Sequence, residues 1–364
     1  MADRLRSGII GAGFIGGVHA HAVHASGGTL SVVADSTPEA AEQAAARLGA
    51  RSAARSAQEV IESPDVDVVH ICTPNFTHAD LARAAIEAGK TVICEKPLAT
   101  TVADAGSLVD SADRAGLHTA VPFVYRFYPA VREARARISR GDGGPLWLLH
   151  GSYLQDWLSG ASETNWRVDP RQGGGSRAFG DIGVHWCDLL EFVTGHRITR
   201  LSARLSRAFA DRPGQSGSPS DSTEDGAVVM FETDRGAVGS VVVSQVSPGR
   251  KNRLWFSFDG PNASYSFDQE QPEALWVGAR DGNRVVLRDP ATMSAQAAAY
   301  SRLPAGHPQG YQDSFNAFVS DVYDATRGHG PDGLPTFTDG LRAAVITATV
   351  LESAATGQWI EVPA

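Results

Sequence analysis

The stretch SGIIGAGFIGGVHAHAVHA, residues 7–25, decides the fold of this chain. It opens with a short apolar run typical of a buried strand, and three glycines in the spacing G-x-G-x-x-G lead into a helical pattern. Glycines at this spacing allow a tight turn and the approach of a pyrophosphate, while the start of the helix presents free amide groups to the phosphates. The stretch therefore predicts the first β-α-β unit of a dinucleotide-binding domain. The turn residues expected to contact the cofactor are Gly11, Gly13, Phe14, Ile15 and Gly16.

The next strand-like run, TLSVVAD, ends in Asp35. A carboxylate at this place accepts hydrogen bonds from the ribose hydroxyls of adenosine and repels a 2′-phosphate. Ser36 and Thr37 bring no cationic side chain to offset that repulsion, so we expect NAD rather than NADP. Ser36 with Glu39 also matches a capping box for the helix that follows.

Strand-like and helical segments continue to alternate as far as residue 125. The alternation predicts an α/β fold with a doubly wound parallel sheet, a Rossmann domain over residues 1–125. Ligands of such sheets bind beyond the carboxyl ends of the strands. The residues expected at those ends are Asp35, Thr73, Pro74, Asn75, His78, Glu95 and Lys96.

The pattern changes after residue 125, where many strand-like runs are separated by short turns. This composition predicts an α+β domain over residues 126–364, with a large, mostly antiparallel open sheet. Helical patterns return near the end, at 311–326 and 338–356. The polar, Pro/Gly/Ser-rich segment 210–223 is expected to be a surface loop rather than a site.

Composition and charge exclude several classes of function. The formal net charge is −9, which gives no electrostatic footprint for nucleic acid. No apolar run approaches the ~18 residues that span a bilayer. Arg4, Arg6 and the apolar run after them resemble a signal peptide, but five of the eleven residues from 8 to 18 are glycine. We therefore expect a cytoplasmic protein that binds neither nucleic acid nor membrane.

Cysteine and histidine placement indicates no metal site. Three cysteines, an odd number at irregular spacing, read as buried thiols in a reducing compartment. His19, His21 and His24 could suggest a metal, but on a helix the first two point about 200° apart. We expect no metal here.

A second stretch, GDIGVHWCDLLEF at 180–192, predicts an amphipathic helix. Asp181, His185 and Asp188 recur along it as a polar stripe about 60° wide. Such a stripe is usually the solvated side of a helix, and Asp181 could be only an N-cap. It could equally be the working face of an active site, and the stretch alone leaves both readings open.

Taken together, the motifs resemble the Gfo/Idh/MocA oxidoreductases over nearly the whole chain. The resemblance rests on the glycine turn followed by a histidine, TPN at 73–75, EKP at 95–97, YRF at 125–127, GDIGVH at 180–185, TEDGA at 223–227 and GHPQGY at 306–311. It implies a Rossmann domain, a C-terminal sheet that often forms the subunit interface of a homo-oligomer, and NAD(P)-dependent oxidation of a sugar or cyclitol. The catalytic positions it implies are Lys96, Asp181 and His185.

Within the family, YLQDWL at 153–158 is similar to the levoglucosan dehydrogenase branch. That similarity implies sugar contacts from Tyr128, Gln155 and Trp157. Trp166 and Arg167 are expected to approach the nicotinamide or sugar, and His307 to line the pocket.

The expected reaction oxidises a secondary hydroxyl of a pyranose, an anhydrosugar like levoglucosan, or an inositol to a ketone. A histidine with an ordinary pKa of about 6.5 is mostly neutral at pH 7, so His185 is assigned as the base. Lys96 would polarise the hydroxyl, and Asp181 would hold a neighbouring hydroxyl or orient the imidazole. Two alternatives stay open: a lyase or glycosidase that oxidises its sugar transiently, and a non-catalytic NAD-dependent sugar sensor.

Overall fold

The computed structural model describes residues 4–209, 212–214 and 223–364. The chain forms two compact units, residues 1–124 with 311–344 and residues 125–310 with 345–364. Most of the loop expected at 210–223 lies outside the described residues. The units divide the chain differently from the expected domains at two places: Tyr125 belongs to the second unit, and residues 311–344 belong to the first.

The first unit is built on a six-stranded sheet in which every neighbouring pair is parallel. The order 3-2-1-4-5-6 is that of the Rossmann fold, which confirms the predicted fold class. In sheet order the strands are β3 (Ser52–Ala53), β2 (Thr29–Ala34), β1 (Arg6–Ile10), β4 (Val68–Ile71), β5 (Thr91–Cys94) and β6 (Thr119–Ala120).

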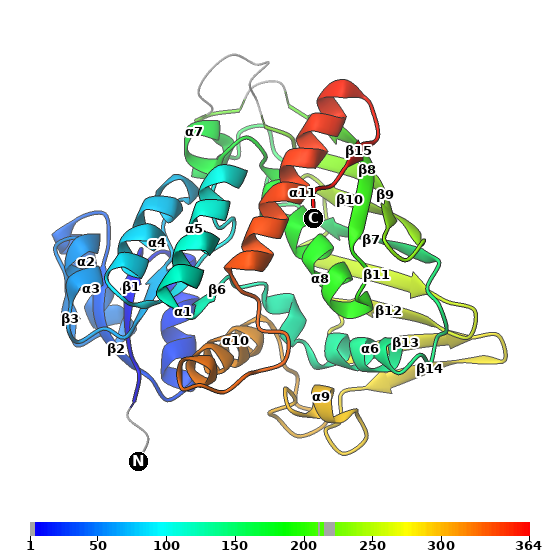
Figure 1. The fold of residues 1–364 in the computed structure, drawn as a ribbon, viewed down its shortest axis with the longest axis horizontal. Coiled ribbons are helices and arrows are strands. Elements are labelled where there is room, and N and C mark those ends of the chain that lie inside the picture. Colours follow the sequence, from blue (N-terminus) through cyan, green and yellow to red (C-terminus); the bar gives the residue numbers. More distant parts are fainter. Residues whose placement is uncertain (1–3, 210–211, 215–222) are drawn as a thin grey trace. The chain divides into compact units, whose positions relative to one another are not determined.

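Helices connect these strands and pack beside the sheet (Figure 1). They are α1 (Phe14–Ala25), α2 (Pro38–Leu48), α3 (Ala57–Glu62), α4 (His78–Glu87) and α5 (Val102–Ala115). The capping box expected at Ser36 is wrong by one residue. Thr37 is the N-cap of α2, and its hydroxyl accepts from the amide of Ala40 at 3.1 Å, because Pro38 occupies the first helical position.

Helix α10 (Tyr311–Thr326) belongs to the first unit because it packs along α1. Phe315 of α10 meets the ring of His19 at 5.1 Å, and Asn316 contacts His21 at 3.1 Å. The sequence pattern predicts that α10 has an apolar face. It does not predict which element of the fold packs against that face.

The second unit is built on a nine-stranded sheet. The prediction of a mostly antiparallel sheet is confirmed, with one parallel pair, β7 and β10. A parallel pair needs a crossover connection, and the long segment between these two strands supplies it. In sheet order the strands are β14 (Gly282–Leu287), β13 (Ala274–Ala279), β12 (Ser264–Asp268), β11 (Arg253–Asp259), β7 (Leu148–Leu154), β10 (Val238–Ser244), β9 (Gly226–Thr233), β8 (Ile198–Ser206) and β15 (Ile360–Glu361).

One face of this sheet is covered by helices α6 (Pro129–Ser139) and α8 (Val184–Thr194) (Figure 1). Trp186 of α8 is buried against the sheet, where its indole Nε1 donates to the carbonyl of Trp255 at 2.9 Å. The remaining helices are the short α7 (Pro170–Gly173) and α9 (Ala295–Ala298), and α11 (Phe337–Thr356), which runs from the first unit into the second. Within the described residues, no helix is both long and apolar enough to cross a membrane.

All three cysteines are free and buried, as the sequence predicted. Cys72 and Cys94 lie in the first unit, and Cys187 lies on α8 in the second.

Candidate active site

The glycine turn after β1 has the geometry of a dinucleotide cradle. Gly11 has φ +90°, and a Cβ there would lie 2.7 Å from the carbonyl oxygen of Cys72. A Cβ on Gly16 would lie 2.2 Å from the carbonyl oxygen of Gly11, whereas a Cβ on Gly13 would meet nothing within 4 Å. The outer two glycines therefore close the turn, and Gly13 leaves open space where a phosphate can approach the backbone.

The start of α1 also suits an anion. Gly13 is its N-cap without a side-chain hydrogen bond, and the first turn carries no acidic residue. Phe14 is 82% exposed. The free amides and the positive end of the helix dipole are therefore available to a pyrophosphate. The residues present fit the cofactor.

Asp35 lies directly after β2 and is held by the backbone. Its carboxylate accepts from the amide of Ser36 at 2.7 Å and from the amide of Ala12 at 3.3 Å. Arg47 of α2 donates to the carbonyl of Ala12 at 2.7 Å. The carboxylate is thus fixed beside the glycine turn, where the sequence placed the adenosine ribose.

The loops after β4 and β5 are joined by His78. The imidazole is fully buried, with Nδ1 2.7 Å from the carbonyl of Pro97 and Nε2 2.9 Å from the carbonyl of Thr73. Burial lowers the pKa of His78, although the two carbonyls partly oppose the shift. Pro74 and Asn75 were also expected to contact the cofactor. Pro74 lies just before a 3-10 turn, and the buried Asn75 begins that turn.

Glu95 and Lys96 follow β5. Glu95 is buried, and its Oε2 accepts from the amide of Lys96 at 3.1 Å. Lys96 is half-buried and lies just past the end of β5, where a cis peptide bond joins it to Pro97. The first unit therefore gathers the glycine turn, Asp35 and both loops at the carboxyl edge of its sheet, as the sequence predicted.

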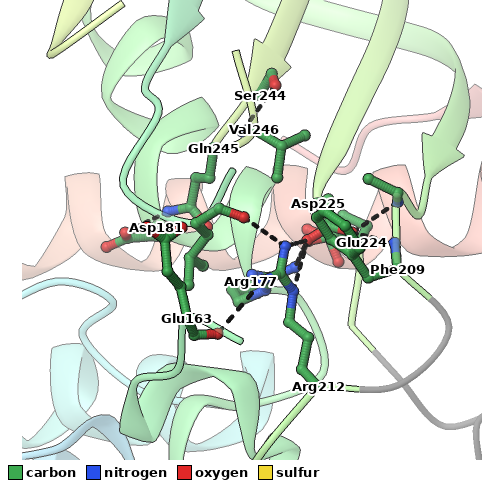
Figure 2. Close-up of polar contacts among 12 residues, drawn as sticks. Glu163, Arg177, Asp181, Phe209, Arg212, Glu224, Asp225, Ser244, Gln245 and Val246 are labelled. Atoms are coloured by element: carbon green, nitrogen blue, oxygen red, sulfur yellow. Dashed lines mark hydrogen bonds and ion pairs between the residues drawn. The ribbon is translucent and has the colours of Figure 1, made fainter. Parts of the chain in front are cut away.

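In the second unit, Asp181 and His185 occupy consecutive turns of one helical segment. Phe179–Gly183 is a π-helical turn that runs directly into α8, so Asp181 lies in the wider turn and His185 in the first turn of the α-helix. Single π-helical turns within helices are frequent at functional sites. Gln245 Nε2 donates to Asp181 Oδ2 at 2.8 Å (Figure 2). Arg167 Nε lies 3.4 Å from Asp181 Oδ1.

A buried polar cluster fixes the π-helical turn. Glu224 Oε1 accepts from the hydroxyl of Ser176 at 2.7 Å and from the amide of Phe179 at 2.8 Å. The neighbouring Asp225 accepts from Arg177 and, at 2.9 Å, from Arg212 (Figure 2). Burial would raise the pKa of Asp225, but the hydrogen bonds and charges of these arginines hold it below its ordinary value.

The same cluster also holds the backbone of Gln245, because the backbone N–H of Gln245 donates to the carbonyl of Asp225 at 2.9 Å. The acidic pair of the TEDGA motif therefore anchors both the turn that carries Asp181 and the residue that binds its carboxylate. Arg212 is a further correction, because it lies in the segment expected to be a surface loop and is buried.

His185 is buried beside two tyrosine rings. The ring of Tyr125 lies 5.2 Å away at 81°, and the ring of Tyr153 lies 6.4 Å away. The two tyrosine hydroxyls contact each other, and Tyr153 donates to Asn252 Oδ1 at 2.8 Å. Burial raises the pKa of Tyr125, so its hydroxyl keeps its proton at neutral pH.

Two of the expected sugar contacts extend this network. Gln155 Nε2 donates to Asn252 Oδ1 at 2.7 Å, and Trp157 Nε1 donates to Gln155 Oε1 at 2.8 Å. Tyr128 is instead buried behind Tyr125, with the two rings stacked 5.9 Å apart.

The remaining predicted residues lie around this group or away from it. Arg167 lies over the indole of Trp166 at 4.3 Å and reaches Asp181 with its guanidinium. His307 occupies an exposed turn, where its carbonyl accepts from Arg288 at 2.5 Å. Asp188, the third member of the polar stripe, forms a buried ion pair with Arg126 and so anchors the helix instead of facing solvent.

Four residues of the second unit were missed by sequence reasoning: Tyr125, Tyr153, Gln245 and Asn252. Tyr125 and Tyr153 lie within motifs that the sequence singled out, and this was an available signal. Gln245 and Asn252 lie near strand ends, and no local pattern distinguishes them from other polar residues there.

Comparisons with known proteins agree with both units. Residues 5–123 match the oxidoreductase family with an NAD-binding Rossmann fold, and residues 131–266 match the GFO/IDH/MocA C-terminal domain. Levoglucosan dehydrogenase of Pseudarthrobacter phenanthrenivorans is 33% identical over 99% of each chain. Inositol 2-dehydrogenase 4 of Saccharopolyspora erythraea is 32% identical over 94% of this chain and 92% of its own.

Solved structures give the same assignment. A levoglucosan dehydrogenase in complex with NADH and levoglucosan superposes with a TM-score of 0.91 at 32% identity, covering 99% of this chain and 100% of the other. An inositol dehydrogenase homolog from Azotobacter vinelandii, in complex with NAD+, gives a TM-score of 0.89 at 27% identity, covering 99% and 98%. The chain belongs to the Gfo/Idh/MocA family of oxidoreductases, with an NAD-binding Rossmann domain at its N-terminus.

Proposed function

We propose that this oxidoreductase is an NAD-dependent dehydrogenase that oxidises a secondary hydroxyl of a pyranose, an anhydrosugar or an inositol to the ketone. The observation that carries the proposal is the placement of Asp181 and His185 on consecutive turns of one helical segment, beside hydroxyl and amide groups suited to a polyol. Relatives named as levoglucosan and inositol dehydrogenases support the substrate class.

NAD, when bound, supplies the hydride acceptor. Gly11, Gly13 and Gly16 with the start of α1 would hold its pyrophosphate, and Asp35 would hold its adenosine ribose. Thr73, Asn75 and Glu95 lie on the loops proposed to line the nicotinamide end. His78 joins those loops from a fully buried position, so we propose that it acts through them.

His185 is proposed as the base that takes the hydroxyl proton. A neutral imidazole has one unprotonated nitrogen that can take a proton, and the surrounding tyrosine rings limit the access of water to it. The Lys96 ammonium would donate to the same oxygen and stabilise the charge that develops on it. Asp181, held by Gln245, would accept from a neighbouring hydroxyl of the substrate.

The remaining side chains would choose the substrate. Gln155 and Asn252 offer amide groups to sugar hydroxyls, and Trp157 offers a flat apolar face for the C–H groups of a pyranose. Levoglucosan is the first candidate, because a relative of that name and its solved structure match nearly the whole chain.

A substrate panel tests this proposal. NAD+ reduction, followed by NADH absorbance, is measured with levoglucosan, glucose, galactose, xylose, myo-inositol and scyllo-inositol. We expect net NADH formation with at least one of them, stoichiometric with ketone. Product without net NADH would instead indicate a lyase or glycosidase with transient oxidation, and sugar binding without turnover would indicate a sensor.

The role of His185 has its own test. His185→Ala should lower kcat by about 10²–10⁴-fold while the Kd for NADH stays unchanged, because only proton removal is lost. His329→Ala, at an exposed turn, is the matched control. An unchanged kcat in the His185 variant would exclude it as the base.

We further propose that a second copy of the chain covers the outer face of the nine-stranded sheet. The exposed apolar side chains there include Val228, Met230, Val238, Val242 and Trp276. Val228 and Val242 are cross-strand partners, so the apolar surface is continuous across β9 and β10. Val242→Glu should shift the sedimentation coefficient toward that of a monomer, and wild-type protein that sediments as a monomer would contradict the proposal.

A further inference from the structure

A chain of buried polar side chains crosses the first unit, from α10 to the loop after β5. Its members are Tyr323 on α10, Ser7 on β1, His70 on β4, His19 on α1 and Glu95 after β5. The accessible area of Ser7, His19, His70 and Tyr323 is zero, and Glu95 is buried as well. The proposed chemistry uses none of the first four.

This array of side chains begins with the hydroxyl groups of Tyr323 and Ser7. The Tyr323 hydroxyl lies 2.7 Å from Ser7 Oγ, which lies 3.0 Å from His70 Nε2. Gly28 makes room for the tyrosine, because a Cβ at that position would lie 2.7 Å from the hydroxyl.

The two histidines then connect the hydroxyls to the carboxylate. His70 Nδ1 lies 3.0 Å from His19 Nδ1, with the rings perpendicular. His19 Nε2 lies 3.2 Å from Glu95 Oε1, and the other oxygen of Glu95 accepts from the amide of Lys96.

These contacts fix the proton positions when both histidines are neutral. A carboxylate only accepts, so His19 Nε2 carries the hydrogen and His19 Nδ1 accepts. His70 must then donate from Nδ1 and accept at Nε2, which requires the Ser7 hydroxyl to donate. The Tyr323 hydroxyl donates to Ser7. Every hydrogen bond therefore points the same way, from Tyr323 toward Glu95.

The electrostatics agree with this arrangement. Burial puts the pKa of His70 well below its ordinary value, which keeps this imidazole neutral. Burial raises the pKa of Tyr323 to about 12. Burial alone would raise the pKa of Glu95, but its hydrogen bond with His19 and the charge of Lys96 hold it below the ordinary value, so Glu95 is a carboxylate.

The charged and titratable groups around the two ends are few. Glu95 faces Lys96, His78 and the thiols of Cys72 and Cys94, and Tyr323 faces Arg327 and Asp67. Glu95 is the carboxylate at one end of the hydrogen-bonded array. Because a carboxylate only accepts, it sets the direction of every hydrogen bond in the array.

A buried polar chain is a costly way to fill a core, because apolar residues of similar shape stabilise as well or better. The array ends where Glu95 accepts from the backbone amide of Lys96, and the Lys96 side chain is proposed to bind the reacting hydroxyl. We propose that the one-way array from Tyr323 to Glu95 positions Lys96, with His19 as the positioning residue that orients the carboxylate. This inference rests on the proposed role of Lys96.

The first test reads the tautomers and does not depend on turnover. In full-length protein labelled with ¹⁵N-histidine, His19 should carry its hydrogen on Nε2 and His70 on Nδ1. His19→Gln and His70→Asn assign the signals. The opposite tautomers, or a His19 imidazolium at neutral pH, would overturn the array.

The second test reads function. His19→Leu cannot donate to Glu95, so kcat should fall about 10- to 10²-fold with KM and the Kd for NADH nearly unchanged. His19→Gln should restore most of kcat, because its amide can donate to Glu95 and its oxygen can accept from His70. His24→Leu, on the same helix but exposed, is the matched control.

The outcomes separate the two proposals. Equal kcat values for the Leu and Gln variants would overturn the positioning role, as would a loss carried mainly by the Kd for NADH. If Lys96→Met leaves kcat unchanged, the proposed role of Lys96 fails, whereas the tautomer assignment stands or falls by itself. Should His19→Leu not fold, the tautomers and the Gln variant still decide.

Discussion

Gln245 Nε2 donates a hydrogen bond of 2.8 Å to Asp181, and the backbone amide of Gln245 donates to the carbonyl of Asp225. The carboxylate proposed to bind the substrate is therefore oriented by a buried residue that no sequence motif contains. This relationship connects the TEDGA motif to the active site, because the same acidic pair fixes both the π-helical turn and the Gln245 backbone.

The first prediction concerns this contact. Gln245→Leu removes the donor to Asp181 and should lower kcat/KM by about 10- to 10²-fold, because a misplaced binding group costs that much. Steady-state kinetics on the best substrate, with thermal melting to verify folding, measure the effect. Gln58→Leu, at an exposed position on α3, is the control, and equal activity of the two variants would show that Asp181 needs no such support.

The second prediction separates two glycines of one turn. Gly16→Ala should destabilise the protein by about 1–3 kcal/mol, because its Cβ would lie 2.2 Å from a backbone oxygen. Gly13→Val should leave the melting temperature nearly unchanged and weaken NADH binding, because its side chain enters open space. Urea denaturation and NADH titration give the two readouts. Tight NADH binding by the Gly13 variant would place the pyrophosphate elsewhere.

The third prediction concerns cofactor choice. Asp35→Ser removes a fixed negative charge and should raise the affinity for NADPH relative to NADH by about tenfold, as expected for loss of one partly screened repulsion. Fluorescence quenching by the two cofactors measures the ratio. If the wild-type protein already binds NADPH more tightly than NADH, the role given to Asp35 is wrong.

The fourth prediction is a pH dependence. The pKa of Asp225 lies below its ordinary value of 3.8, so its ion pairs stabilise the fold fully above that pH. The stabilisation is lost as the pH falls through the lower, folded-state pKa. Asp225→Asn should therefore cost about 3–5 kcal/mol at pH 7, because it leaves two buried arginines without their charge partner.

Urea denaturation at neutral and acidic pH tests this. The difference between wild type and Asp225→Asn should shrink below the ordinary pKa, whereas exposed Asp281→Asn should show little difference at any pH. A difference that does not change with pH would mean that the charge of Asp225 contributes nothing.

The sequence predicted those features that local patterns encode. The glycine turn, the alternation of strands and helices and the acid after β2 were enough for the Rossmann sheet and its binding edge. The spacing of Asp181 and His185 predicted that both lie on one polar stripe of a helix, and only the family resemblance implied a catalytic role for them. The spacing was interpreted at 3.6 residues per turn, whereas the structure has a π-helical turn there.

The rest depends on long-range packing. Asn252 reaches Tyr153 only because β7 and β11 are neighbours in the sheet, and no segment of sequence states that pairing. Tyr323 reaches Ser7 only because α10 returns to the first unit after nearly two hundred residues. The N-cap of α2 was misplaced by one residue because Ser36 and Thr37 are both good caps.

The outer face of the large sheet also bears on handling the protein. Strand β14 ends the sheet, and Val285 and Leu287 on it are 61% and 64% exposed. An apolar terminal strand is a template for pairing with other chains, and Asn283 and Arg284 are the polar residues that oppose it here. If a second copy covers the sheet face, dilution that separates the copies would expose an aggregation-prone surface, so shelf life and assembly would depend on the same side chains.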